Sequence, residues 1–366
     1  MDATWEDLRP RGKPVITPSN ADTKPPAGPP VLAGVILGLT AAICLMLLAF
    51  STPTIHSGPR DLPLAVSGPE PAISHLHTAL EEKNPGAFMV TTYASVDEAT
   101  AAIKDRDAVG GISIAHDGRV TIQTASAAGS PYASLLRNIG SGLAAGGQAV
   151  VTYADVVPLT SDDPAGSGLA ALALPLAFGG TASAVIVATL FRRSRILCVL
   201  GSVAFSVLAG LAATAILQYW LGAIDGPFWA TAAGVGLGIA AISLTVLGLE
   251  SLLGYAGAGI GALIMVFIAN PLSGIATGPA WLPQPWGEIG QFLPIGAAGT
   301  VIRSAAFFDG AGSGHALLVL AAWIVFGLIL VALSTRRESH PAGPRTQRRQ
   351  RNRHRLRVHR KGSPAN

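Results

Sequence analysis

The stretch from Leu169 to Asn270 constrains the fold more than any other part of the chain, because it carries very few charges. Its five charged residues all lie at or near the ends of apolar runs: Arg192, Arg193, Arg195, Asp225 and Glu250. Each run is about 20 residues long, which crosses a hydrocarbon core of roughly 30 Å as a helix. Soluble core helices are the alternative, but one chain rarely needs four in series. We therefore expect transmembrane helices over 169–191, 196–218, 228–249 and 252–270.

Two further apolar runs flank this block, at 31–50 and 315–333. The first could be a cleaved signal peptide, but it is longer than a usual signal core and begins well inside the chain. We expect it to remain as a membrane anchor. The composition agrees, with 50% hydrophobic and only 13% charged residues. The predicted fold class is an α-helical polytopic membrane protein with six transmembrane helices. Its expected partners therefore include the lipid bilayer.

The segment 51–168, between the first and second predicted helices, has the pattern of a small α/β domain. β-Branched and aromatic residues alternate with helical stretches, and His116-Asp117-Gly118 is typical of a hairpin turn. The expected strands are 62–66, 88–93, 109–115, 119–124 and 150–157, and the expected helices are 71–82, 96–105 and 131–145. The segment is large enough for a core of its own.

Positive charge sets the predicted orientation. The short loop Arg192–Arg195 holds three cations in four residues, and the tail 334–366 holds eleven Lys and Arg. By the positive-inside rule both are cytoplasmic. Counting helices from them puts the N-terminal segment 1–30 inside and the α/β domain 51–168 outside. We expect a multi-pass protein of the plasma membrane with both termini cytoplasmic. Segment 1–30 is rich in proline and is predicted to be disordered.

Residues 271–314 differ from an ordinary loop because they combine five prolines with two tryptophans. Tryptophan prefers the headgroup zone of a bilayer. We expect one or two short external helices that lie on the outer leaflet or re-enter it, with a plain external loop as the alternative.

The sequence shows no constellation of catalytic or metal-binding residues. His75 and His77 are two positions apart on a predicted helix and point in different directions, and no glycine-rich loop precedes a lysine as in a P-loop. Both cysteines, Cys44 and Cys198, lie within predicted membrane helices, which argues against disulfides. The basic tail lacks interleaved aromatic residues and a supporting fold, so specific nucleic-acid binding is not expected. We expect no enzyme activity, no cofactor and no metal site.

The predicted cytoplasmic turns hold the candidate contact residues for a partner protein. Arg192, Arg193 and Arg195 form one turn, and Glu250 lies in the other with almost no loop around it. The opposite charges could pair with each other, or each could meet a complementary group on a partner. Glu250 could also be a solvated residue at a helix end.

Several short sequence motifs, and their order along the chain, resemble those of the type-2 exporter permeases of ABC transporters, in the branch that includes the phage-infection-protein (Pip/YhgE) family. They are Leu62–Val66, Asp105–Gly111, Asp155–Leu159, Asn270–Gly274, Gly290–Pro294 and Phe307–Gly310. The resemblance covers residues 31–335. It implies a homodimer or heterodimer of permeases powered by a separate ATPase subunit, which would contact Arg192, Arg193, Arg195 and Glu250.

Two functions follow as hypotheses. The first is a permease subunit that moves an amphiphilic or cell-envelope compound outward. The second is a non-transporting membrane scaffold or surface receptor whose external domain binds a partner. Copurification of an ATPase would favour the first.

Overall fold

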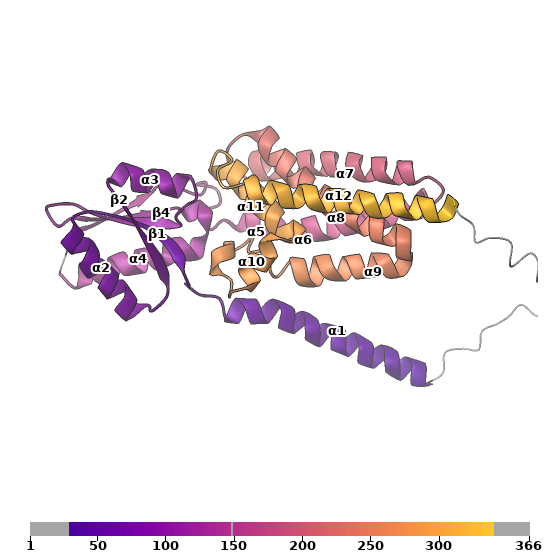
Figure 1. The fold of residues 1–366 in the computed structure, drawn as a ribbon, viewed down its shortest axis with the longest axis horizontal. Helices are drawn as coiled ribbons and strands as arrows, with labels where there is room; N and C mark the ends of the chain where they lie inside the picture. Colours follow the sequence, from indigo (N-terminus) through magenta and orange to yellow (C-terminus); the bar gives the residue numbers. More distant parts are fainter. Residues whose placement is uncertain (1–28, 148, 340–366) are drawn as a thin grey trace, which may run out of the picture. The chain divides into compact units, whose positions relative to one another are not determined.

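The computed structural model describes residues 29–147 and 149–339, and it contains one five-stranded sheet and a set of long helices (Figure 1). The predictions for 1–28 and for the basic tail beyond Ser339 lie outside the described residues. The chain divides into two compact units, residues 1–47 and 48–366. The described part of the first unit is the beginning of helix α1 (Pro29–Ile55), whose apolar side chains are exposed.

The sheet belongs to the second unit and has the strand order β2-β1-β3-β4-β5. Its strands are β1 (Leu62–Ser67), β2 (Phe88–Tyr93), β3 (Gly110–Ile114), β4 (Val120–Thr124) and β5 (Val151–Asp155). Strand β1 pairs in parallel with β2 and β3, and β4 pairs in parallel with β5. Strands β3 and β4 form an antiparallel hairpin. Its turn contains Gly118 at φ 81°, a conformation that glycine adopts without strain.

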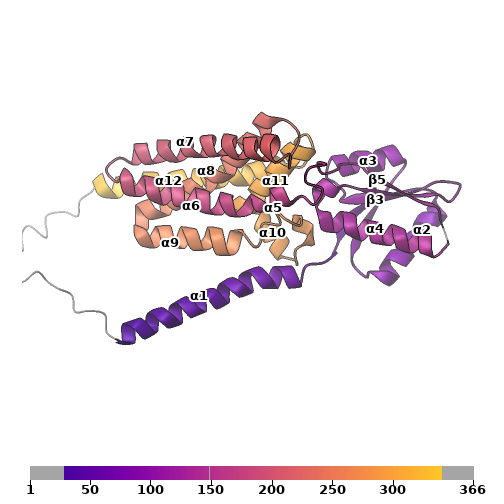
Figure 2. The same ribbon diagram turned by 180° about the vertical axis from the view of Figure 1, so that it is seen from behind.

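Helices cover both faces of this sheet (Figure 2). On one face α2 (Glu70–Lys83) and α4 (Ser130–Ala145) pack against Leu64 and Val66 of β1. On the other face α3 (Val96–Lys104) packs through Ile103 against Ala65. Successive residues of β1 thus point to opposite cores, as the two-residue period of a strand requires. Burial of both faces stabilises the sheet.

The predicted α/β pattern of segment 51–168 is confirmed, with all five strands and all three helices present near the expected bounds. The sequence signals explain this agreement. Helix α3 begins where the Ser95 hydroxyl accepts a hydrogen bond from Glu98 N, and the Glu98 carboxylate accepts one from Ala94 N. Such reciprocal capping is a sequence signature of a helix start.

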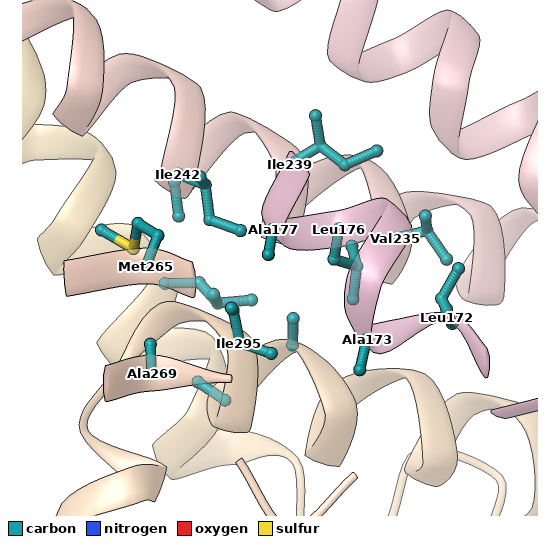
Figure 3. Packing of buried hydrophobic residues seen from close by; sticks show 14 of the residues in the cluster. Leu172, Ala173, Leu176, Ala177, Val235, Ile239, Ile242, Met265, Ala269 and Ile295 are labelled. Carbon is teal, nitrogen blue, oxygen red and sulfur yellow. The ribbon is translucent and has the colours of Figure 1, made fainter. Parts of the chain in front are cut away.

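The helical part of the second unit is built around α8 (Phe228–Leu253). It contacts α6 (Ala173–Leu190), α7 (Arg195–Ala215), α11 (Pro294–Phe307) and α12 (Gly314–Ser339). A short helix, α5 (Ser167–Ala171), leads into α6, and a π-helical turn over Ile216–Trp220 extends α7. Buried side chains from these helices form one core, in which Leu176, Val235 and Ile295 meet (Figure 3).

Five helices in the described residues are long and apolar enough to cross a membrane: Pro29–Ile55, Ser167–Leu190, Arg195–Trp220, Phe228–Leu253 and Gly314–Thr335. They agree with a helical, multi-pass membrane protein. The run predicted as 252–270 differs. Helix α8 continues to Leu253, and Gly254, with a φ of 65°, then ends the helix. What remains is a 15-residue apolar helix, Tyr255–Ala269, which consists of α9 (Tyr255–Leu263) and a π-helical end.

The Pro/Trp-rich segment 271–314 contains a 3₁₀ turn over Pro279–Trp281 and two α-helices, α10 (Trp286–Gln291) and α11. Short helices were expected here. Unlike a helix that rests on a surface, α11 buries most of its side chains. Its Ala298 lies so close to α8 that a Cβ atom on Gly238 would be 2.6 Å from the Ala298 Cβ. Helix α11 is therefore part of the helical core.

Candidate functional site

The two turns singled out in the sequence lie together in the structure. Arg195 begins α7 and Glu250 is in the last turn of α8, and their side chains form an ion pair at 3.5 Å between Nη1 and Oε2. The two side chains are only 19% and 11% exposed. Of the two arrangements expected for these opposite charges, the described structure shows pairing with each other.

The remaining arginines of the first turn are more exposed. The guanidinium of Arg192 lies over the ring of Tyr255, 5.1 Å from its centroid, in a cation–π contact. Arg193 is exposed. The Ser194 hydroxyl accepts a hydrogen bond from Leu197 N and caps α7, which holds the turn in one shape. Arg193 is thus the cation of this turn that is best placed to meet a partner.

A pocket of about 560 Å³ opens at the other end of the helical part. The second compact unit begins at Leu48, so the last turns of α1 belong to it and form one wall. The lining residues are mostly apolar and come from two segments: Leu48, Ala49, Thr52, Pro53, His56 and Arg60, and Phe267, Ile268, Pro271, Leu272, Pro283 and Trp286. Its volume is in the range of small-molecule sites.

Two of the lining residues, His56 and Arg60, are polar side chains in a mostly apolar lining. Arg60 and His56 are exposed, and the His56 ring bonds through Nδ1 to the carbonyl oxygen of Thr52 at 2.9 Å. Gly58 N donates to the carbonyl oxygen of Trp281 at 3.1 Å, which ties the 56–60 segment to the Pro/Trp-rich region. None of the lining residues is an acid. An apolar chain in the pocket with an anionic group at Arg60 fits this arrangement.

Sequence reasoning missed the pocket. Its walls come from segments separated by about two hundred positions, and no spacing within either one relates them. The available signal was indirect: tryptophans and prolines beside an apolar run mark the region where lipid headgroups meet protein.

In the described part of the chain, no group of three or more His, Cys, Asp or Glu side chains lies close enough to hold a metal ion. His75 and His77 are on α2, where both are exposed.

No family model matches the chain. No curated protein and no solved structure is significantly similar to it.

Proposed function

We propose that the chain is the permease subunit of an exporter-type ABC transporter of the phage-infection-protein kind. It moves an amphiphilic or cell-envelope compound outward across the plasma membrane and is powered by a separate ATPase. The order of elements supports the proposal: one apolar helix, a small α/β unit, and then the remaining apolar helices with a Pro/Trp-rich segment before the last.

In the proposed topology the chain crosses the membrane six times, with both termini cytoplasmic and residues 51–168 outside. The Arg192–Arg195 turn supports this orientation through its positive charge. The sixth crossing is Tyr255–Ala269, whose 15 residues span about 22 Å as an α-helix. It begins at the turn that holds Glu250 and ends at the Pro/Trp-rich segment, so a crossing fits both of its ends.

The single observation that carries the transport proposal is the mostly apolar pocket whose lining also includes the exposed Arg60. A substrate with a hydrocarbon part would bury that part among Leu48, Ile268 and Leu272. A negative head group would remain near Arg60. In the proposed topology this pocket lies at the outer end of the helices, where an exported amphiphile leaves the protein.

The cytoplasmic end supplies the proposed contact with the ATPase. Arg195 and Glu250 hold α7 and α8 together, while the exposed Arg193 and the exposed ring of Tyr255 form the accessible part of the turns. Movement of the turns would then be passed to α8, which contacts most of the other helices. A second permease subunit, identical or related, would complete the transport path.

The pocket can be tested by filling it. In Ala49→Trp a large side chain occupies the wall, and Ala42→Trp on the same helix is the matched control because Ala42 does not line the pocket. Each protein is purified in mild detergent, and bound amphiphiles are extracted and quantified by mass spectrometry. We expect Ala49→Trp to lose at least one bound species about tenfold, equivalent to about 1.4 kcal/mol. Ala42→Trp should match wild type. Equal amounts in all three proteins would refute the pocket as the amphiphile site.

A further inference from the structure

Two arginines, one buried and one half-buried, lie near each other where the α3–β3 turn meets α11. Arg303, in the last part of α11, is only 3% exposed. Arg106 follows α3 with a φ of 68° and is half-buried, and its guanidinium lies over the Phe308 ring, 5.2 Å from the centroid. Arg106 also donates to Ser304 Oγ and Thr300 O, on either side of Arg303 along the same helix. The two guanidiniums thus share one region.

The hydrogen bonds in this region satisfy only part of the two guanidiniums. Arg303 donates through Nη2 to the carbonyl oxygen of Ile275 at 2.7 Å, while its Nε is buried without a partner in the described residues. Arginine carries more N–H donors than any other side chain, and a buried donor left unpaired is costly. Additional acceptor oxygens would therefore stabilise this arrangement.

The charge of the pair is not neutralised by any described carboxylate. The ion pairs of the described residues lie elsewhere, at Asp117–Arg119, Arg137–Asp155 and Arg195–Glu250. Asp105 and Asp107 flank Arg106 in the sequence, but both are exposed. Carbonyl and hydroxyl oxygens accept hydrogen bonds without supplying a negative charge. Two like charges in a poorly hydrated region need a counter-charge more than they need neutral acceptors.

Both arginines remain charged at neutral pH. Burial, and to a smaller extent the positive charge of Arg106, lowers the pKa of Arg303 to about 10. Burial also lowers the pKa of Arg106. A pKa of about 10 still leaves the guanidinium protonated at pH 7, so two positive charges face any ligand there.

We propose that Arg106 and Arg303 bind a phosphate-type oxyanion. Its oxygens accept the unused N–H groups, for which the planar guanidinium fork is well suited. Its negative charge offsets the repulsion between the two arginines. Because Arg106 lies in the α3–β3 turn and Arg303 in α11, the bound anion also links that turn to the helical core. The proposal does not depend on transport activity.

The test uses the full-length protein in a non-ionic detergent, with inorganic phosphate as the probe and chloride at matched ionic strength as the reference. Binding is measured by equilibrium dialysis of labelled phosphate, and thermal unfolding is followed in parallel. The variants are Arg303→Gln and Arg106→Gln, with Arg119→Gln as the matched control because Arg119 is exposed in the β3–β4 hairpin. Dialysis reports binding even if one variant unfolds early, and Arg106→Gln changes a turn rather than the core.

We expect wild type and Arg119→Gln to bind phosphate saturably and to be stabilised by it. Arg303→Gln and Arg106→Gln should each bind about tenfold more weakly or worse. A general salt effect on stability would act equally on all four proteins. The proposal is overturned if wild type shows no saturable binding, or if both site variants bind as wild type does.

A second arm identifies the source of the anion. Dioctanoyl phosphatidic acid carries the phosphate on a lipid, and dioctanoylglycerol is the same lipid without it. Tighter binding of the phosphatidic acid than of inorganic phosphate, with competition between them, supports a lipid headgroup as the natural ligand. Equal binding supports free phosphate. Binding of dioctanoylglycerol as tight as that of the phosphatidic acid, without competition by phosphate, contradicts an anion site.

Discussion

Gly327 should be the position in α12 that is least tolerant of a methyl group. A Cβ atom on Gly327 would lie 2.5 Å from the carbonyl carbon and the oxygen of Leu244 and 2.7 Å from Thr245 N, all in the α8 backbone. The contact is reciprocal, because a Cβ atom on Gly248 would lie 2.6 Å from Gly327 O. Backbone atoms cannot rotate away as a side-chain end can, so Gly327→Ala must separate the two helices.

The size of the effect follows from these distances. Carbon atoms in contact prefer roughly 3.5–4.0 Å, so the helices must move apart by about 1 Å, and a gap of that size forfeits a quarter to a half of each dispersion contact. Packing is the main attraction between helices in a bilayer, where apolar burial gives little drive for association. We expect Gly327→Ala to cost about 1–3 kcal/mol, the usual range for overpacking.

The matched control is Gly259→Ala in α9. It is the same substitution in another apolar helix, but no atom lies within 4 Å of the new methyl group. Each protein is purified in detergent and heated, and the fraction still monodisperse is followed by size-exclusion chromatography. Gly327→Ala should lower the midpoint by several degrees, at about 2–4 °C per kcal/mol. Gly259→Ala should not lower it. Equal midpoints for the two variants would refute the inferred close packing of α8 on α12.

Three other changes test separate parts of the structure. The Tyr132 hydroxyl is buried without a hydrogen-bond partner in the described residues, and burial raises its pKa to about 12. The free energy of unfolding of wild type, measured by chemical denaturation, should therefore fall by up to a few kcal/mol between pH 10 and 12. Tyr132→Phe should lose less stability over this pH range and should match or exceed wild type at neutral pH. Equal losses of stability in the two proteins would contradict this. Glu250→Gln removes the carboxylate that forms the partly buried ion pair with Arg195, so it should lower the free energy of unfolding by about 1–3 kcal/mol, whereas Arg193→Gln at an exposed site should change it little. In intact cells, a cysteine in place of the exposed Ser74 should react with a membrane-impermeant thiol reagent and one in place of Ser363 should not, and the reverse labelling would exclude the proposed topology.

The sequence predicted most elements of the fold because local signals mark their ends. The arginines at 192–195 separate α6 from α7, and the reciprocal hydrogen bonds of Ser95 and Glu98 begin α3. Where such a signal was ambiguous, the predicted end of the helix differed from the observed one. Glu250 was expected to mark the turn after α8, but the helix continues one turn further to Leu253, and the following apolar helix is correspondingly short.

The candidate sites were less predictable, because their residues come from distant parts of the chain. Opposite charges near helix ends indicated that Arg195 and Glu250 could meet. Nothing local relates Arg106 to its hydrogen-bond partner Ser304, or Arg60 to Leu272, which lines the same pocket. These contacts depend on how α11 and the Pro/Trp-rich segment fold onto their neighbours. That arrangement is set by tertiary packing rather than by residue spacing.

The proposal of an ATP-driven permease is tested most directly by what the protein binds in its own membrane. The full-length chain is affinity-purified in mild detergent, its copurifying proteins are quantified by mass spectrometry, and ATP hydrolysis by the complex is measured. The proposed function predicts an ABC-type ATPase in amounts comparable to the permease, with vanadate-sensitive hydrolysis, and weaker retention of that ATPase by Arg193→Gln. A preparation with neither ATPase nor ATP hydrolysis would contradict the permease function and favour a membrane scaffold.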